Sequence, residues 1–186
     1  MSSELDAAGE ASRDQGAEPL LAFADALLSA NQREPGKPGG EMRQFVTFFL
    51  RDDEIGIPIL QCREIIRAPA ITRVPEAPEH VRGVVNLRGR ILPAVDTRKC
   101  LGYEAAPPTL KSRLIVVEVA GRSFALLVDR VARILKLAAS EIAAPPEGER
   151  SLATLGVVGA GDATIYLTDA ERILCVKRAE PSTHKE

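Results

Sequence analysis

The sequence predicts a mainly β protein, all-β apart from a short N-terminal helix, in which two small units of the same design lie side by side. Short apolar runs separated by glycine, proline and acidic residues predict strands joined by tight turns. The same order of runs occurs twice, because a shift of 69 residues places Phe45 on Leu114 and a shift of 73 places Asp96 on Asp169. Each unit holds four or five predicted strands, which is typical of a small closed or sandwiched sheet.

The composition is that of a folded protein without a membrane segment. Of the 186 residues, 45% are hydrophobic, which is enough for one core or two smaller ones. The net charge of −2 gives no general attraction to nucleic acids or anionic membranes. Every apolar run is shorter than the roughly 18 residues that a membrane helix needs, and the first residues lack the basic and apolar regions of a signal peptide. We therefore expect a cytoplasmic protein with no direct insertion into the membrane.

The two ends differ in composition from the centre of the chain. The sequence divides into an extension over 1–41, a central domain over 42–177 and a polar tail over 178–186. The extension begins rich in alanine, serine, glycine and acidic residues, and we expect it to be flexible. Apolar residues at helical spacing from Leu20 to Leu27 predict a short amphipathic helix over 19–31. This helix either packs weakly on the body or docks in a groove of a partner.

The first unit covers roughly residues 42–110. Its predicted strands lie at 45–50, 55–60 and, as a hairpin, within 81–96. Pro58 indicates an edge position for the second strand, because proline has no N–H to donate to a neighbouring strand. The hairpin turn requires a positive φ, which Gly89 can supply. The second unit, roughly 111–176, repeats this order, and an exchange of strands between the two units stays open.

Patterns of catalytic or metal-binding residues are weak. Only two histidines are present, and the three cysteines lie too far apart for a disulfide framework or a metal-ligand spacing. A cysteine-dependent enzyme would need His80 beside Cys62 or Cys100. Asp96 and Asp169 each end a strand at equivalent places, which favours turn capping over acid–base catalysis. We expect a protein that is not an enzyme and that holds no cofactor or metal.

Basic residues around the hairpin raise a second function class, nucleic-acid binding. They are Arg82, Arg88, Arg90, Arg98 and Lys99. Aromatic platforms for stacking are missing, because Tyr103 alone lies nearby, and acidic residues such as Glu79 and Asp96 dilute the positive charge. Nucleic-acid binding therefore stays a weak alternative, and it would require an affinity that falls steeply with salt.

Six short motifs lie between Ile55 and Val131, within a matching stretch of about residues 43–176. They are Ile55-Gly56-Ile57, Glu64-Ile65, Ile71-Thr72-Arg73-Val74-Pro75, Gly83-Val84-Val85-Asn86-Leu87-Arg88-Gly89, Leu92-Pro93-Ala94-Val95-Asp96 and Val128-Asp129-Arg130-Val131. Together they resemble the CheW family of chemotaxis coupling proteins, and the Gly-x-x-Asn-Leu-Arg-Gly element after Ile-Thr-Arg-x-Pro is the most specific part. The family's fold, two intertwined five-stranded barrels, agrees with the internal repeat.

The resemblance implies an adaptor that joins the cytoplasmic tips of chemoreceptors to the regulatory domain of a CheA-type histidine kinase. Contacts with that kinase and with other CheW-like proteins would build rings. The receptor- or kinase-binding residues that it implies are Ile59, Cys62, Glu64, Ile71, Val84, Asn86 and Arg88. Arg88 would donate its planar fork to a receptor carboxylate or a helix C-terminus, or hold Glu64 in place. Ile59 and Val84 are equally compatible with a core position, and Cys62 with a small hydrophobic residue.

Three positions depart from the family pattern. Pro58 replaces an acidic residue, Cys62 replaces a valine and Thr97 replaces a leucine. Together with the N-terminal extension, these departures indicate a specialised paralogue. The alternative function is therefore the same adaptor role in a pilus, gliding or other non-flagellar pathway.

Overall fold

The structure is a computed structural model that describes residues 42–145, 153–161 and 163–175. The helix predicted over 19–31 and the polar tail over 178–186 lie outside these residues. Strands dominate the described part of the chain, as the sequence predicts. None of the described helices has the length and apolarity needed to cross a membrane.

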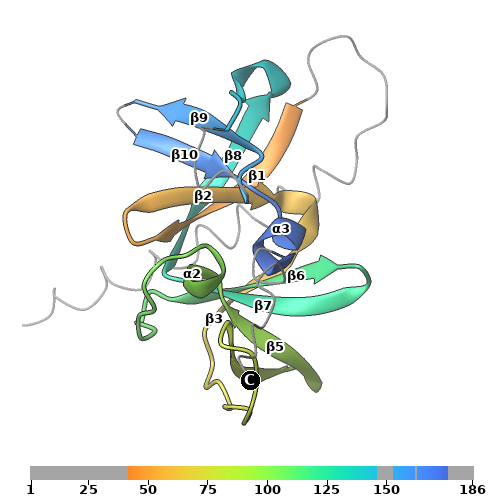
Figure 1. Ribbon diagram of the computed structural model, residues 1–186. Helices are drawn as coiled ribbons and strands as arrows, with labels where there is room; N and C mark the ends of the chain where they lie inside the picture. Colours follow the sequence, from red (N-terminus) through yellow and green to blue (C-terminus); the bar gives the residue numbers. More distant parts are fainter. Residues whose placement is uncertain (1–41, 146–152, 162, 176–186) are drawn as a thin grey trace, which may run out of the picture.

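The strands form two five-stranded sheets joined by short helical turns. Sheet A contains β1 (Met42–Leu50), β2 (Asp53–Pro58), β8 (Arg130–Ala138), β9 (Gly156–Ala160) and β10 (Ala163–Leu167). Sheet B contains β3 (Cys62–Arg67), β4 (Val81–Leu87), β5 (Arg90–Asp96), β6 (Arg113–Val119) and β7 (Arg122–Val128). The helical turns are η1 (Ile59–Gln61), α2 (Thr97–Cys100), η2 (Ala139–Glu141) and α3 (Ala170–Cys175). Figure 1 shows sheet A above sheet B, with α2 and α3 in contact at their junction.

The two sheets have the same design. Sheet A has the order β8-β1-β2-β10-β9, and sheet B has the order β3-β6-β7-β5-β4. The one parallel pair is β2 with β10 in sheet A and β7 with β5 in sheet B, and the other neighbours are antiparallel. Strands β1 to β5 therefore correspond in order to β6 to β10, which confirms the repeat predicted from the sequence.

The sheets nevertheless cut across the two sequence units over 42–110 and 111–176. Strands β1 and β2 of the first unit join β8, β9 and β10 of the second, whereas β6 and β7 join β3, β4 and β5. The crossover lies at η1, which turns the chain from β2 into β3, and β3 then pairs with β6 through Ile65 and Ile115. The two sequence units therefore match the repeat, but each sheet contains strands of both units because strands are exchanged between them.

An extended segment closes each sheet into a barrel, which we call barrel A and barrel B after their sheets. In barrel B the chain after β3 reaches the opposite edge strand, where Thr72 and Val84 exchange backbone hydrogen bonds of 2.9 and 2.8 Å. Ala143 and Val157 do the same in barrel A, at 2.9 and 3.0 Å. The approach requires a glycine, because a Cβ on Gly83 would lie 2.1 Å from the Thr72 carbonyl oxygen.

Alternation along the strands divides the apolar core into layers. On β6, Leu114 and Val116 belong to the cluster that fills barrel B, whereas Ile115 and Val117 belong to a shared cluster between the barrels. The shared cluster also holds side chains of sheet A, among them the fully buried Phe48 of β1. The two barrels therefore pack as one body, which fixes the relative positions of residues on their surfaces.

One prediction about strand position is wrong. β2 is not an edge strand, because it lies between β1 and β10. Pro58 is tolerated there because it is the last residue of β2, and the pairing with β10 has already ended at Gly56. A proline at a strand end removes no bond from the ladder on that side.

The predicted turn capping is confirmed at both equivalent aspartates. The carboxylate of Asp96 accepts the N–H of Lys99 at 3.4 Å and begins α2. The carboxylate of Asp169 accepts the N–H of Arg172 at 2.7 Å in the first turn of α3. These carboxylates accept hydrogen bonds from backbone N–H groups that have no partner within their short helices, which is a structural role.

Candidate functional site

The tip of the β4–β5 hairpin is a tight turn with two left-handed residues. Arg88 has a φ of 50° and Gly89 has a φ of 83°, which is the pattern of a type I′ turn. The side-chain oxygen of Asn86 accepts the N–H of Gly89 at 2.9 Å. The sequence predicts the positive φ of Gly89 but not that of Arg88. The turn therefore presents Arg88 on a fixed backbone.

Arg88 reaches back to β3 and pairs with Glu64. The two side chains are 3.0 Å apart, nitrogen to oxygen, and the Arg88 side chain is 80% exposed. β3 and β4 are the two opposite edges of sheet B, so this pair spans the place where barrel B closes. An exposed pair contributes only about 0–1 kcal/mol to stability. Its surface position leaves the remaining donors of the guanidinium available to a partner.

Ile71 and Val84 lie beside this pair. Both are half-buried. Val84 is one partner of the Thr72–Val84 bridge that closes the barrel, and Ile71 directly precedes the other partner. Ile71 is partly buried and packs against the cluster that fills barrel B. Glu64, Ile71, Val84, Asn86 and Arg88 lie around the place where barrel B closes, a region that we call the hairpin surface, and within it Ile71 turns toward the interior cluster.

Two residues of the implied binding set lie in the core, which is the alternative that the sequence left open for them. Ile59 and Cys62 are each only 1% exposed and belong to the shared cluster between the barrels. Burial raises the pKa of the Cys62 thiol to about 12, so the side chain acts as a neutral, small hydrophobic group. The 3-10 turn η1 points Ile59 inward and leaves its neighbour Leu60 65% exposed. Sequence reasoning missed Leu60 because the parity of a strand does not hold through a 3-10 turn.

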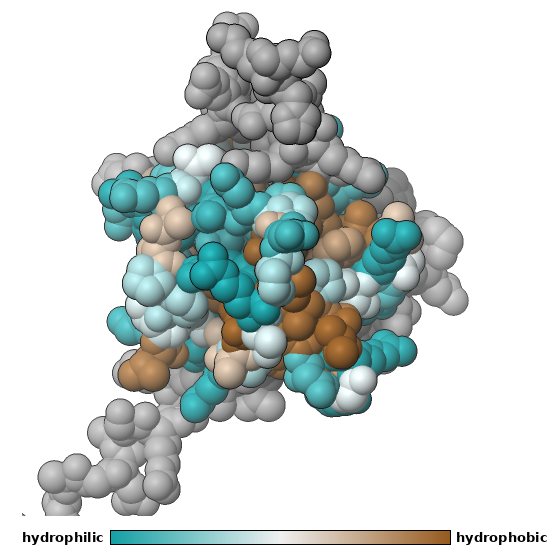
Figure 2. Space-filling view, turned by 60° about the horizontal axis from the view of Figure 1, so that its bottom comes forward, coloured by the Kyte–Doolittle hydropathy of each residue, from teal (hydrophilic) through white to brown (hydrophobic). Residues whose placement is uncertain are grey.

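Figure 2 views the molecule from the end that carries sheet B. Apolar surface gathers there near the centre, with polar side chains around it. On this barrel three large apolar side chains are exposed, namely Val74 at 39%, Ile91 at 70% and Leu110 at 99%. Ile91 stands opposite Asn86 in the hairpin and so adjoins the hairpin surface. Exposed apolar groups with a polar rim are typical of a protein-binding site.

The relative position of the barrels is held by an ion pair near the junction. Arg98 of α2 donates to the Asp129 carboxylate at 2.8 Å, and that carboxylate also accepts the N–H of Arg51 from the β1–β2 turn at 2.7 Å. Partial burial raises the pKa of Asp129, but the hydrogen bonds from Arg98 and Arg51 outweigh it, and the pKa lies below its usual range. The charged carboxylate therefore links elements of both barrels.

The basic residues of the hairpin region are partly neutralised by carboxylates. Arg82 contacts Asp96 at 3.3 Å, Arg88 pairs with Glu64, and Arg98 pairs with Asp129. Within the described ranges no group of three or more histidine, cysteine, aspartate or glutamate side chains could hold a metal ion. The site is thus a surface of mixed charge and apolar area.

Comparisons with known proteins agree with this fold. A sequence profile of the CheW-like domain matches residues 44–177. The chain is 32% identical to the chemotaxis protein CheW of Helicobacter pylori over 136 residues, which cover 72% of this chain and 82% of that protein. It is 37% identical to the chemotaxis protein CheW of Rhizobium meliloti over 135 residues, which cover 70% of this chain and 86% of the relative.

A solved structure shares the fold. The crystal structure of the scaffolding protein TtCheW from Thermoanaerobacter tengcongensis superposes with a TM-score of 0.66 and 28% identity, covering 75% of this chain and 90% of that one. The two-barrel fold and the sequence relatives indicate the same family. The chain belongs to the CheW family of chemotaxis coupling proteins.

Proposed function

We propose that this chain is a non-enzymatic adaptor that joins the cytoplasmic tip of a chemoreceptor to a CheA-type histidine kinase, and that the receptor binds the hairpin surface. Membership of the family supports the adaptor role. The observation that carries the assignment of the surface is Arg88, an arginine side chain that is 80% exposed on a turn with a fixed backbone. The adaptor works in the cytoplasm and reaches the membrane through its receptor partners.

The chemistry of the hairpin surface suits a helical partner. Arginine offers five N–H donors in a planar fork, and one contact to Glu64 leaves most of them for a carboxylate or a helix C-terminus. Ile71 and Val84 add apolar area, worth about 25 cal/mol for each Å² removed from water. Because the closing bridge fixes both residues, little conformational entropy is lost when a partner binds.

The kinase contact is proposed to use the ends of the barrels. The regulatory domain of a CheA-type kinase has, by family resemblance, the same two-barrel fold. The two barrels of this chain share one strand order, so each presents an equivalent end to a partner of like fold. Such a partner, or another CheW-like protein, can join at either end, and alternating contacts would produce rings.

Binding of purified chain to a soluble receptor tip fragment tests the receptor assignment. Arg88→Ala should weaken binding by about tenfold or more, as expected for the loss of charge-assisted hydrogen bonds. Arg88→Lys should recover only part of the loss, because a lysine keeps the charge but not the fork. Arg122→Ala, which removes an exposed arginine of β7 at another place on sheet B, serves as the matched control.

Unchanged receptor binding by a folded Arg88→Ala protein would contradict the assignment. The same preparations discriminate the nucleic-acid alternative. Binding to single-stranded DNA or RNA with a steep loss of affinity between low and high salt would favour that function, whereas a flat or absent response eliminates it.

A further inference from the structure

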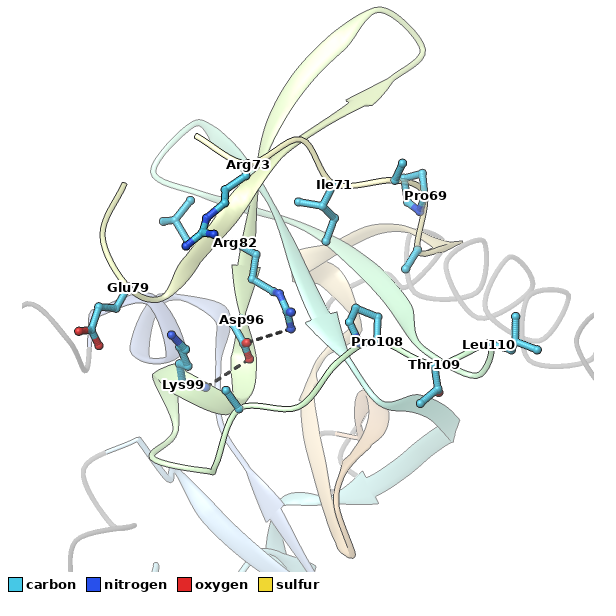
Figure 3. Close-up of a pocket in the computed structure, with 14 residues that line it drawn as sticks. Pro69, Ile71, Arg73, Glu79, Arg82, Asp96, Lys99, Pro108, Thr109 and Leu110 are labelled. Atoms are coloured by element: carbon cyan, nitrogen blue, oxygen red, sulfur yellow. Dashed lines mark hydrogen bonds and ion pairs between the residues drawn. The ribbon is translucent and has the colours of Figure 1, made fainter. Parts of the chain in front are cut away.

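A slot opens in the wall of barrel B where two neighbouring segments separate. The pairing of β3 with β6 ends at Arg67 and Arg113. Beyond that point residues 68–73 follow one side of the slot, and the loop that precedes β6 follows the other. Figure 3 shows the slot between these segments, with the end of β5 and α2 at its base. Its volume is about 1040 Å³.

One side of the slot is an extended backbone with unused hydrogen-bonding groups. Thr72 directs its N–H and C=O toward Val84. In an extended chain the neighbouring residues direct theirs the opposite way, away from β4. In the part of the chain that the structure describes, the backbone groups of Ile71 and Arg73 have no hydrogen-bond partner. This stretch is therefore a short free edge, bounded on either side by Pro69 and Pro75.

Some charged side chains of the slot have an ion-pair partner among the described residues, and others do not. Arg82 donates to Asp96 at 3.3 Å and to the carbonyl of Ala106 at 2.8 Å, and Asp96 also caps α2. These two groups neutralise one another. Arg73 and Lys99, by contrast, form no ion pair with any described residue. The remaining acidic lining residue, Glu79, points away from the slot in Figure 3.

Apolar groups occupy the other half of the slot. Figure 3 shows Pro69, Ile71, Pro108 and Leu110 on one side, with Arg73 and Lys99 on the other. Leu110 is 99% exposed, although the hydrogen bond from Thr109 N–H to Ser112 Oγ at 2.8 Å holds its turn in place. An ordered loop that exposes a leucine beside a cleft supplies an apolar contact for a partner.

We propose that this slot binds an extended peptide segment of a partner protein, which adds as a strand to the Ile71–Arg73 edge. Ile71 and Arg73 are two residues apart, so their side chains share one face. The segment therefore carries an apolar residue and an acidic residue at positions i and i+2. The apolar residue packs between Ile71 and Leu110, and the carboxylate lies between Arg73 and Lys99. Main-chain hydrogen bonds give the affinity, and this pair of side chains gives the specificity.

This proposal shares Ile71 with the hairpin surface, but its charged contacts, Arg73 and Lys99, lie outside that surface, so variants of these two residues test it separately from the receptor assignment. We do not assign the slot to a small anion, because the slot is open and a small ligand is usually buried over most of its surface. Charge complementarity favours an acidic segment, and the free backbone edge favours an extended one.

The test is a titration of the isotope-labelled full chain with synthetic peptides, followed by nuclear magnetic resonance. The probe is a capped threonine heptapeptide with leucine at its third position and glutamate at its fifth. The amide signals of Ile71 and Arg73 should shift, and their hydrogen exchange should slow by about tenfold or more. The exchange of Thr72, which already donates to Val84, should change little. A peptide N-methylated at its leucine should bind at least tenfold more weakly.

Protein variants test the side-chain contacts. Arg73→Ala and Lys99→Ala should each weaken peptide binding by about tenfold, the effect of one charge-assisted hydrogen bond. Arg122→Ala should leave it unchanged, and a peptide with lysine in place of glutamate should not bind.

Three results would overturn the proposal. Equal binding of the N-methylated peptide would exclude strand addition. Saturable shifts of Arg73 and Lys99 with inorganic phosphate, without peptide binding, would assign the slot to a small anion. An increase of tenfold or more in peptide affinity on deletion of residues 1–41 would assign it to the chain's own acidic extension, whereas an unchanged affinity supports a partner segment.

Discussion

Replacement of Gly83 by alanine tests the closure of barrel B. Gly83 has a φ of 146°, which an L-residue rarely adopts, and a Cβ there would lie 2.1 Å from the Thr72 oxygen, 2.7 Å from its carbonyl carbon and 3.0 Å from the Arg73 Cα. All three are backbone atoms, so no flexible side chain can move aside. The two Thr72–Val84 hydrogen bonds must therefore break.

The cost follows from these contacts. Loss of two hydrogen bonds costs about 2 kcal/mol, and the unfavourable φ costs a further 1–3 kcal/mol or so. Gly83→Ala should thus lower the free energy of unfolding by about 3–5 kcal/mol, a large share of the roughly 5–15 kcal/mol that folded domains possess. Urea denaturation followed by circular dichroism measures this difference.

Gly89→Ala is the matched control for that experiment. Gly89 also has a positive φ, 83°, but a Cβ there would meet nothing within 4 Å. It should lose only about 1 kcal/mol, the cost of the left-handed backbone. If both variants lose the same stability, the close approach of Thr72 to β4 is refuted as the device that closes the barrel.

Three further predictions concern single side chains. Asp129→Asn should lower the free energy of unfolding at pH 7 by no more than about 1 kcal/mol, since water screens the partly exposed pair. Hydrogen bonding lowers the pKa of Asp129, so its contribution to stability is present above the ordinary value of 3.8 and is lost as pH falls through the lowered value. Denaturation curves of the two proteins should therefore converge in acid. Cys62, with its pKa raised to about 12, should resist iodoacetamide at pH 8 until urea unfolds the chain, as read by peptide mass spectrometry, and rapid labelling of the native protein would contradict its burial. Arg88→Ala should change the free energy of unfolding by less than about 1 kcal/mol, and a larger loss would make the Glu64 pair structural.

The repeat and the hairpin could be predicted because local sequence encodes them. Equivalent glycines and aspartates, such as Gly83 with Gly156 and Asp96 with Asp169, recur at one spacing. Each serves the same purpose in its barrel, a close backbone approach for the glycines and a helix cap for the aspartates. Local chemistry of this kind is visible without tertiary structure.

The exchange of strands and the burial of Ile59 and Cys62 were left open by the sequence and could not be decided in this way. Both depend on η1, where three residues turn the chain from one sheet into the other and break the alternation of the strand. The same turn exposes Leu60 instead of Ile59. Likewise, Pro58 ended a central strand and not an edge strand, because the position of a strand in its sheet depends on distant partners such as β10.

The slot was also invisible in the sequence. Arg73, Arg82 and Lys99 are spread over three elements, and only the fold shows that Arg82 is neutralised by Asp96 whereas the other two are not. The free edge at Ile71 depends on which way Thr72 directs its backbone groups.

The most direct test of the adaptor role is the autophosphorylation rate of a CheA-type kinase mixed with receptor tips, measured with and without this chain. The rate should respond to the receptor only when the chain is present. Arg88→Ala should abolish that response, while Arg122→Ala should preserve it. A receptor response of the same size without the chain, or with Arg88→Ala in its place, would contradict the proposed coupling through the hairpin surface.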